Sequence, residues 1–278
     1  MKHCILLFIV GSIGLVGCVN DNTHSDSPPS AALASTAKPV KATSRRAIYR
    51  NQTFNQPGRA LDLEGCDEVV IENCRFENTG GIFIQARAGM SIRVVNNQAV
   101  NIRRTKGMEY AQFLQVSGCG PNGEAKAVPV DLLVQGNVIV NAKGQCDVED
   151  NINVIAVCGT AQHPLRIAGN IITGAWPADT SEKSLRDYSG GGIICDRGTS
   201  WAVIEGNTVR ETTNYGIAIS GGTHNIIRGN TVTAKDARNV GIYCANLYAP
   251  DRFAENKVEG NKVAWQTPKG RNDYWLPK

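Results

Sequence analysis

The sequence lacks several features that would point to a common class of function. Its nine cysteines form no CxxC pair and no Cys/His cluster, so neither a zinc site nor a thioredoxin-like redox site is indicated. The net charge of +4 is too weakly basic to indicate nucleic-acid binding, although it is compatible with an acidic glycan. The apolar run at residues 4–17 is too short for a comfortable membrane span.

What the sequence contains instead is a short phrase that recurs six times, here called the Asn phrase. It consists of an apolar residue, a small or polar residue, Asn, and a short apolar segment, as in IEGNTV at 204–209. A seventh copy, VIENCRF at 70–76, has Cys74 in place of Asn. Self-similarity at intervals of this kind is typical of stacked-repeat proteins. The aligned asparagines are Asn97, Asn137, Asn170, Asn207, Asn230 and Asn261.

The segments on either side of each Asn are rich in Val and Ile and too short for helices. A single residue between two strands requires a sharp bend, and Asn tolerates the left-handed conformation that such a bend can need. A third short strand precedes most copies, for example GGIIC before Asn207. Three strands per turn with variable loops predict an all-β fold. We expect a right-handed parallel β-helix solenoid of about seven coils, in which the stacked asparagines form a ladder.

In these repeats the chain resembles right-handed parallel β-helix proteins of the pectate-lyase-like superfamily, over roughly residues 47–265. Several segments are also similar to uncharacterised bacterial β-helix lipoproteins. The resemblance implies the fold and secretion but no particular activity, because a fold alone does not define function. These segments are EDNINVIAVCGT at 149–160, SGGGIICDRG at 189–198, YGIAISGGTHN at 215–225, NVGIYCANLY at 239–248 and the tail GRNDYW at 270–275.

The N-terminus predicts a lipoprotein signal peptide at residues 1–17. It has a basic start, an apolar stretch and the sequence Leu15-Val16-Gly17-Cys18, which resembles a bacterial lipobox. Cys18 would then be the lipidated first residue, and the chain would be anchored in the cell envelope. Val19, rather than Asp, follows Cys18, which by analogy with enterobacterial sorting indicates the outer membrane. The alternatives are an ordinary secretory signal and an uncleaved anchor.

The rest of the chain divides in two. Residues 18–46 are rich in Ser, Thr, Ala and Pro and predict a flexible tether after the lipidated cysteine. Residues 47–278 are long enough for a single β-helix domain with a C-terminal cap. We expect Trp265, Tyr274 and Trp275 to cover the open end of the last coil.

Seven cysteines remain after Cys4 and Cys18, an odd number for a compartment that permits disulfides. Cys158 and Cys195 each precede their Asn by 12 residues, so we expect them to stack on adjacent coils. Cys119 and Cys146 lie in loops and could form a bridge. The alternative for the stacked pair is that both are ordinary small core residues.

Three long loops are expected to flank one sheet of the β-helix, at residues 103–110, 143–151 and 176–191. Stacking of the coils would place these loops side by side, at a spacing of roughly 4.8 Å per coil. The strand that precedes each Asn phrase is then the floor of a groove, and we expect the functional residues in this groove.

Two chemistries are compatible with the groove residues. A uronate lyase needs a cation beside the sugar carboxylate, and calcium is the candidate cofactor, with Asp147, Glu149 and Asp150 as its ligands. It also needs a base, for which Lys143, Arg186 and Arg197 are candidates. A glycoside hydrolase needs two opposed carboxylates, for which Asp150 and Asp196 are candidates. The tandem-Asp and Gly-His-Gly arrangements of pectin hydrolases are absent, as is the basic motif of the known pectate and alginate lyases.

Aromatic side chains supply flat apolar faces for sugar rings, and the loops and strands of the groove contain several. The candidate substrate-binding residues are Trp176, Tyr188, Tyr243 and Tyr248. Each candidate has a structural alternative. The loop carboxylates could be solvated turn residues, Asp196 and Arg197 could form an ion pair in a turn, and Tyr243 could fill the groove floor.

The sequence therefore predicts a secreted, monomeric lipoprotein that acts on or binds an acidic polysaccharide, with no nucleic-acid partner. Whether it is an enzyme stays open, and a polysaccharide lyase is favoured over a hydrolase. The alternative function is a non-catalytic glycan-binding or structural envelope lipoprotein.

Overall fold

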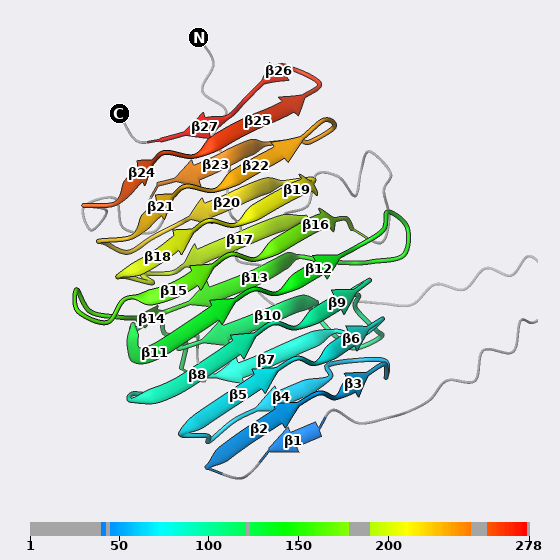
Figure 1. Cartoon of the computed structure of the whole chain (residues 1–278), viewed down its shortest axis with the longest axis vertical. Helices are drawn as coiled ribbons and strands as arrows, with labels where there is room; N and C mark the ends of the chain where they lie inside the picture. Colours follow the sequence, from blue (N-terminus) through cyan, green and yellow to red (C-terminus); the bar gives the residue numbers. More distant parts are fainter. Residues whose placement is uncertain (1–39, 43–44, 121–122, 178–189, 246–254, 277–278) are drawn as a thin grey trace, which may run out of the picture. The chain divides into compact units, whose positions relative to one another are not determined.

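The computed structural model describes residues 40–42, 45–120, 123–177, 190–245 and 255–276. These residues form 27 β-strands (Figure 1). Within them there is no helix that is long and apolar enough to cross a membrane. The predicted signal peptide and Cys18 lie outside the described residues, as does most of the tether. The structure already has a strand, β1, within the segment expected to be tether.

The strands form three sheets of nine strands each, in which neighbouring strands come from successive turns of the chain. The first sheet runs β1 (Val40–Ala42), β4 (Leu61–Leu63), β7 (Gly81–Gln85), β10 (Gln112–Ser117), β13 (Asp150–Ile155), β17 (Gly191–Asp196), β20 (Tyr215–Ile219), β23 (Val240–Cys244) and β27 (Tyr274–Trp275).

The second sheet follows the first in every turn. It runs β2 (Arg46–Arg50), β5 (Glu68–Glu72), β8 (Met90–Val95), β11 (Val128–Gln135), β15 (Leu165–Ala168), β18 (Ala202–Glu205), β21 (Ile226–Arg228) and β24 (Lys257–Glu259), with β14 (Val157–Cys158) paired to β11.

The third sheet completes the turn. It runs β3 (Thr53–Phe54), β6 (Arg75–Glu77), β9 (Gln98–Val100), β12 (Val138–Val140), β16 (Ile171–Ala175), β19 (Thr208–Thr212), β22 (Thr231–Ala234), β25 (Lys262–Thr267) and β26 (Gly270–Arg271). The pairs within the sheets are parallel, as between β13 and β17, except that β25 and β26 are antiparallel.

This arrangement confirms the right-handed parallel β-helix. Alternate side chains of each strand point into the solenoid, as Val69 and Ile71 of β5 do, both fully buried. The solenoid extends beyond the expected seven coils, because the first and last turns carry no Asn phrase. In Figure 1 the coils follow one another from β1–β3 at one end to β25–β27 at the other.

The asparagine ladder lies at the corner between the second and third sheets, here called the ladder corner. Asn170 shows the pattern: its side-chain oxygen accepts hydrogen bonds from the backbone N–H and the side-chain amide of Asn137, at 3.0 and 2.9 Å. Its own amide donates to the side-chain oxygen of Asn207 and to the carbonyl of Val134, at 2.9 and 3.0 Å. Bonds between neighbouring rungs run from Asn97 to Asn261, and the backbone N–H of Cys74 donates to Asn97.

The left-handed residue of this corner is not the ladder Asn, as we expected, but the residue before it. The phrase therefore needs glycine or asparagine one position earlier, because these residues adopt a positive φ at little cost. The side chain of the ladder Asn itself points inward. The residues with positive φ are Asn73, Asn96, Gly136, Gly169, Gly206, Gly229 and Gly260.

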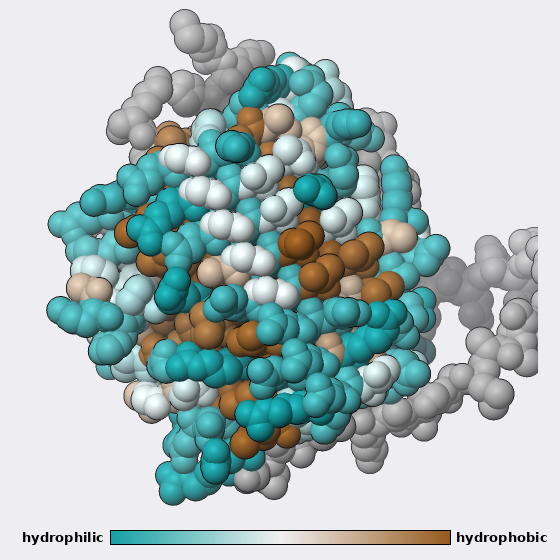
Figure 2. Space-filling model, viewed as in Figure 1, coloured by the Kyte–Doolittle hydropathy of each residue, from teal (hydrophilic) through white to brown (hydrophobic). Residues whose placement is uncertain are grey.

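The outer face of the third sheet carries exposed apolar side chains. Val138 and Val140 of β12 and Ile171 of β16 are 39–44% exposed, and Val138 pairs with Ile171. Figure 2 shows apolar side chains gathered over this part of the sheet. These residues lie away from the first sheet, where the groove was expected.

Two expectations about single residues are wrong. Trp265 does not cover the open end but is fully buried inside the last coils, where the absence of side chains on Gly216 and Gly241 leaves room for its ring. Cys158 does not stack on Cys195, because Cys195 pairs with Val154 while Cys158 is bridged to Ser200. The cysteines of the described residues are free thiols.

Candidate functional site

The described parts of the long loops expected beside the first sheet lie side by side. They connect the third sheet to the first, at what is here called the loop corner. The backbone N–H groups of Asp147, Val148 and Glu149 donate to the carbonyls of Ile102, Trp176 and Ala111, each at 3.0 Å. These bonds hold described parts of three successive loops together, which confirms this part of the sequence interpretation.

A break in strand alternation turns one carboxylate onto the outer face of the first sheet. In β13, Asn151 and Ile152 are both fully buried, so two consecutive residues point inward. Phe113 and Leu114 of β10 do the same, and the register of β10 with β7 shifts there. Because β13 stays in register with β10, the shift carries over to it and turns the side chain before the inward pair, Asp150, to the outer face. A strictly alternating strand would have directed Asp150 into the apolar core.

Asp150 is 4% exposed and is held by two side chains. The hydroxyl of Tyr215 donates to its Oδ1, and the side-chain amide of Asn153 donates to its Oδ2 at 3.2 Å. Tyr215 lies two coils away and reaches Asp150 across Gly191, which pairs with both. A Cβ atom on Gly191 would lie 2.0 Å from Asp150 Oδ1 and 2.7 Å from the Tyr215 oxygen. The contact therefore depends on glycine at position 191.

Glu149 lies beside Asp150 and is half-buried. The side-chain amide of Gln112 donates to its Oε2 at 2.6 Å. Burial, together with the negative charges of Asp150 and Asp196, raises the pKa of Glu149 to about 9. Burial and the charge of Asp196 likewise raise the pKa of Asp150 to about 7, although the hydrogen bond from Tyr215 opposes this shift. At neutral pH the pair can therefore both hold and accept a proton.

Asp196 lies on the same outer face but at the other end of its strand. Its backbone partner is Ile155, whereas Asp150 pairs with Gly191. The hydroxyl of Ser220 and the backbone N–H of Arg197 both donate to Asp196 Oδ1. The Arg197 side chain is exposed and its φ is +44°. Among the described residues, Arg197 makes no ion pair with Asp196, so the pair is not the ion pair considered as an alternative.

The proposed calcium ligands are used for other contacts. Asp147 accepts two hydrogen bonds from the Arg104 guanidinium, at 2.6 and 3.2 Å. Among the described residues, no group of three or more His, Cys, Asp or Glu side chains is arranged to hold a metal ion. The calcium site therefore stays a prediction to which the geometry adds no support.

The remaining candidates divide into three groups. Lys143 lies with its Nζ atom 5.0 Å from the ring centroid of Trp176, a cation–π contact at the loop corner. Tyr243 is only 7% exposed and packs against Ala218 and Val240, so its ring fills the outer face rather than offering a free surface. Arg186, Tyr188 and Tyr248 lie outside the described residues.

Sequence reasoning missed three residues of this site. Gln112, Asn153 and Tyr215 contact the two carboxyl groups but were not singled out. For Tyr215 a signal was present: aligning GGIIC, YGIAI and VGIYC places Tyr215 one coil beyond Gly191. Gln112 and Asn153 gave no such signal, because their contacts depend on the bulges.

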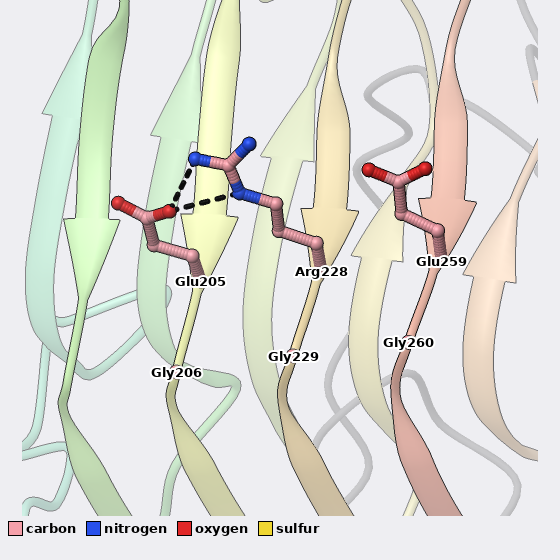
Figure 3. A pocket seen from close by; sticks show the side chains of 6 residues that line it. All are labelled: Glu205, Gly206, Arg228, Gly229, Glu259 and Gly260. Atoms are coloured by element: carbon pink, nitrogen blue, oxygen red, sulfur yellow. Dashed lines mark hydrogen bonds and ion pairs between the residues drawn. The ribbon is translucent and has the colours of Figure 1, made fainter.

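A shallow depression lies on the outer side of the ladder corner, lined by Glu205, Gly206, Arg228, Gly229, Glu259 and Gly260 (Figure 3). Arg228 donates twice to Glu205, at 2.9 and 2.7 Å, and Arg166 adds a third bond at 2.7 Å. These bonds lower the pKa of Glu205. The depression is open, its one guanidinium is bound to Glu205, and nothing in it suggests chemistry.

The fold and the site define a parallel β-helix protein with a buried carboxyl pair on the outer face of its first sheet. The family model described as "Periplasmic copper-binding protein (NosD)" matches residues 130–276, more than half of the chain. The chain therefore belongs to the NosD family. No curated protein and no solved structure matches it.

The family description names copper, so we compared the described side chains with what copper requires. Copper favours imidazole and thiolate ligands. The described histidines are far from forming such a set: His163 is exposed, and His224 stacks on Trp201 with ring centroids 3.9 Å apart and bonds to Glu255. The thiols of Cys195 and Cys244 are buried, which raises their pKa to about 12. The described residues therefore do not fit a copper site.

Proposed function

We propose that the protein is an envelope protein that binds an acidic polysaccharide on the outer face of its first sheet. It would act on this polymer through Glu149 and Asp150. The observation that carries the proposal is this adjacent carboxyl pair beside the loop corner, with pKa values near neutral pH for Asp150 and above it for Glu149. Carboxyl groups tuned in this way are typical of acid–base sites.

The rim of this face favours an acidic polymer over a neutral one. Arg103, Lys106 and Lys143 of the loop corner are exposed. Glu149 is protonated at neutral pH and so can donate a hydrogen bond to a sugar carboxylate instead of repelling it. A polyanion would therefore meet cations at the edge and a neutral carboxyl on the floor.

The reaction that these groups suit is β-elimination at a uronate residue. Asp150, as a carboxylate, would accept the proton from C5. The bond between C4 and the glycosidic oxygen would break, a C4–C5 double bond would form, and Glu149 would give its proton to the departing oxygen. Exchange with water then restores both groups. Because Asp150 must be ionised and Glu149 protonated, we expect activity to peak between about pH 7 and about pH 9.

The deep burial of Asp150 supports one alternative, a non-catalytic glycan-binding protein. At 4% exposure, the carboxyl group is a positioning element for Asn153 and Tyr215 if no sugar atom reaches it. The alternative predicts binding of the same polymer without turnover.

The test is incubation of the purified full-length protein with alginates, pectates and glycosaminoglycans, with calcium or a chelator. The ultraviolet absorbance of unsaturated uronate ends reports elimination. We expect an increase on one polymer that Glu149→Gln and Asp150→Asn abolish and that the matched surface variant Glu205→Gln keeps. Binding without an increase would support the alternative, and no binding of any polymer would contradict both. A response only with calcium would restore the metal prediction.

Membrane attachment is a separate proposal, which rests on the lipobox-like sequence before Cys18. We expect the native chain to incorporate labelled palmitate and to sediment with outer membranes, and the Cys18→Ser variant to do neither. Sedimentation of that variant with membranes would indicate an uncleaved anchor instead.

A further inference from the structure

A row of paired positions runs from the strand of Asp150 toward the N-terminal coils. Asn153 pairs with Gln115 of β10, and Gln115 pairs with Phe83 of β7, so these three side chains form one row on the outer face. Phe83 and Gln115 are half-buried and Asn153 is 6% exposed. Adjacent strands are roughly 4.8 Å apart, so the row spans on the order of 10 Å.

A guanidinium group lies over the far end of this row. Arg59 precedes β4, and its Cζ atom lies 4.4 Å from the ring centroid of Phe83. Within the described part of the chain it forms an ion pair with Asp62 of β4, at 3.7 Å, which is longer than a hydrogen bond. Among the described residues the Arg59 guanidinium makes no hydrogen bond. It is therefore positioned by the aromatic ring and by the long ion pair with Asp62, and its N–H donors are available for a hydrogen-bonding partner.

The polar atoms along the row are also unused. Asn153 Oδ1 and Asp62 Oδ1 are buried and have no hydrogen-bond partner within the part of the chain that the structure describes. A buried polar atom without a partner is costly, so such atoms usually indicate a missing ligand or water. The Gln115 side chain likewise has no partner among the described residues. The row thus offers acceptors suited to sugar hydroxyls, with a cation at one end.

We propose that Arg59 on Phe83 is a carboxylate-binding subsite, two coils from Asp150, for a uronate residue of the same polymer. Gln115 and Asn153 would contact the hydroxyl groups of the sugar units between them. The inference rests on the proposed function and specifies which way the polymer lies: along the stack of coils, toward the N-terminal end. The coil spacing is close to the length of one pyranose unit, so a chain in this direction would present about one unit to each coil.

Arginine suits this role better than lysine. Its planar fork can donate two parallel hydrogen bonds to a carboxylate, and its flat face can stack on an aromatic ring at the same time. Because the contact with Asp62 is long, an incoming carboxylate does not have to displace a tight ion pair.

The experiment measures, by calorimetry on the full-length protein, the affinity for uronate oligomers of two to five units. The variants are Arg59→Ala, Arg59→Lys and the control Arg210→Ala, which removes an exposed arginine from the third sheet. We expect Arg59→Ala to weaken the binding of the longer oligomers by about tenfold, the effect of losing one charge-assisted contact. The shortest oligomer should bind unchanged, Arg59→Lys should be intermediate, and Arg210→Ala should match the wild type.

The outcomes separate the two proposals. If the wild type binds the oligomers and Arg59→Ala behaves like Arg210→Ala, the subsite is wrong and the proposed function stands. If the wild type binds no uronate oligomer, both are wrong. Oligomers whose carboxylates have been reduced to alcohols provide a further check, because Arg59→Ala should not weaken their binding more than Arg210→Ala does. A thermal unfolding curve shows whether each variant is folded.

Discussion

The ladder corner and the outer face of the first sheet are built from the same coils but follow opposite rules. At the ladder corner, six coils place asparagine at one position, and neighbouring rungs make the same bonds. On the outer face, one row of paired positions contains Asp150, Gly191, Tyr215 and Val240, four different chemical types. The uniform position holds the coils in register. At the varied position, side chains of different coils combine into one contact, as Asp150 and Tyr215 do across Gly191.

The largest effect should come from removing one rung of the asparagine ladder. Replacing Asn170 by Ala leaves the buried N–H of Asn137 and the carbonyl of Val134 without partners, at about 1–3 kcal/mol for each group. We expect a loss of about 3 kcal/mol or more in urea unfolding. Asn261→Ala, at the half-buried end of the ladder, should cost about 1 kcal/mol. Equal losses of stability at the two positions would show that an inner rung gains nothing from being bonded to rungs on both sides.

A smaller effect should come from the ionisation of Glu149, on the outer face of the first sheet. The pKa of Glu149 is raised in the folded protein, so between its ordinary pKa and about 9 the unfolded chain is ionised while the folded one keeps its proton. Stability therefore falls as pH rises through this range. We expect the wild type to lose up to about 2 kcal/mol between pH 6 and pH 8 relative to Glu149→Gln. Parallel curves of unfolding free energy against pH for the two proteins would show that the pKa of Glu149 is not raised in the folded protein.

The smallest effect should come from removing one hydroxyl across the row. Tyr215→Phe deletes the donor to Asp150, which should cost about 1 kcal/mol and raise the pKa of Asp150 further, since that hydrogen bond lowers it. The lower limb of the activity profile should then move to higher pH. Tyr274→Phe, which removes an exposed hydroxyl from the last coil, is the control and should leave the profile unchanged. A profile that stays fixed in Tyr215→Phe would show that the hydroxyl does not tune Asp150.

The same contrast explains what could be predicted from the sequence. The ladder was predictable because its rule is written six times, and the β-helix followed from it. The left-handed residue lies one position before the one that we predicted. Asn or Gly occupies that preceding position, and these residues adopt a positive φ as readily as the ladder Asn. The loop corner was predicted from loop length, and Glu149 and Asp150 were singled out within it.

The partners of these carboxyl groups could not be predicted, for a physical reason. The bulges of β10 and β13 decide which side chains face outward, and nothing in a single sequence marks where an extra residue turns inward. The subsite that we propose at Arg59 was missed for a related reason, because it depends on the Phe83 ring one coil away. Asp147 was assigned to a metal, but Arg104, 43 residues earlier in the chain, takes both of its oxygens.

The bonds between the ladder side chains all point the same way along the stack. From Asn97 to Asn230, each side-chain amide donates to the side-chain oxygen of the rung that follows. A coil duplicated within the ladder would therefore meet the same donors and acceptors on both sides. Gene duplication or deletion of whole coils can thus change the length of the molecule, and of any groove along it, without inventing a new fold. In such a molecule the number of repeats sets the length of a binding surface.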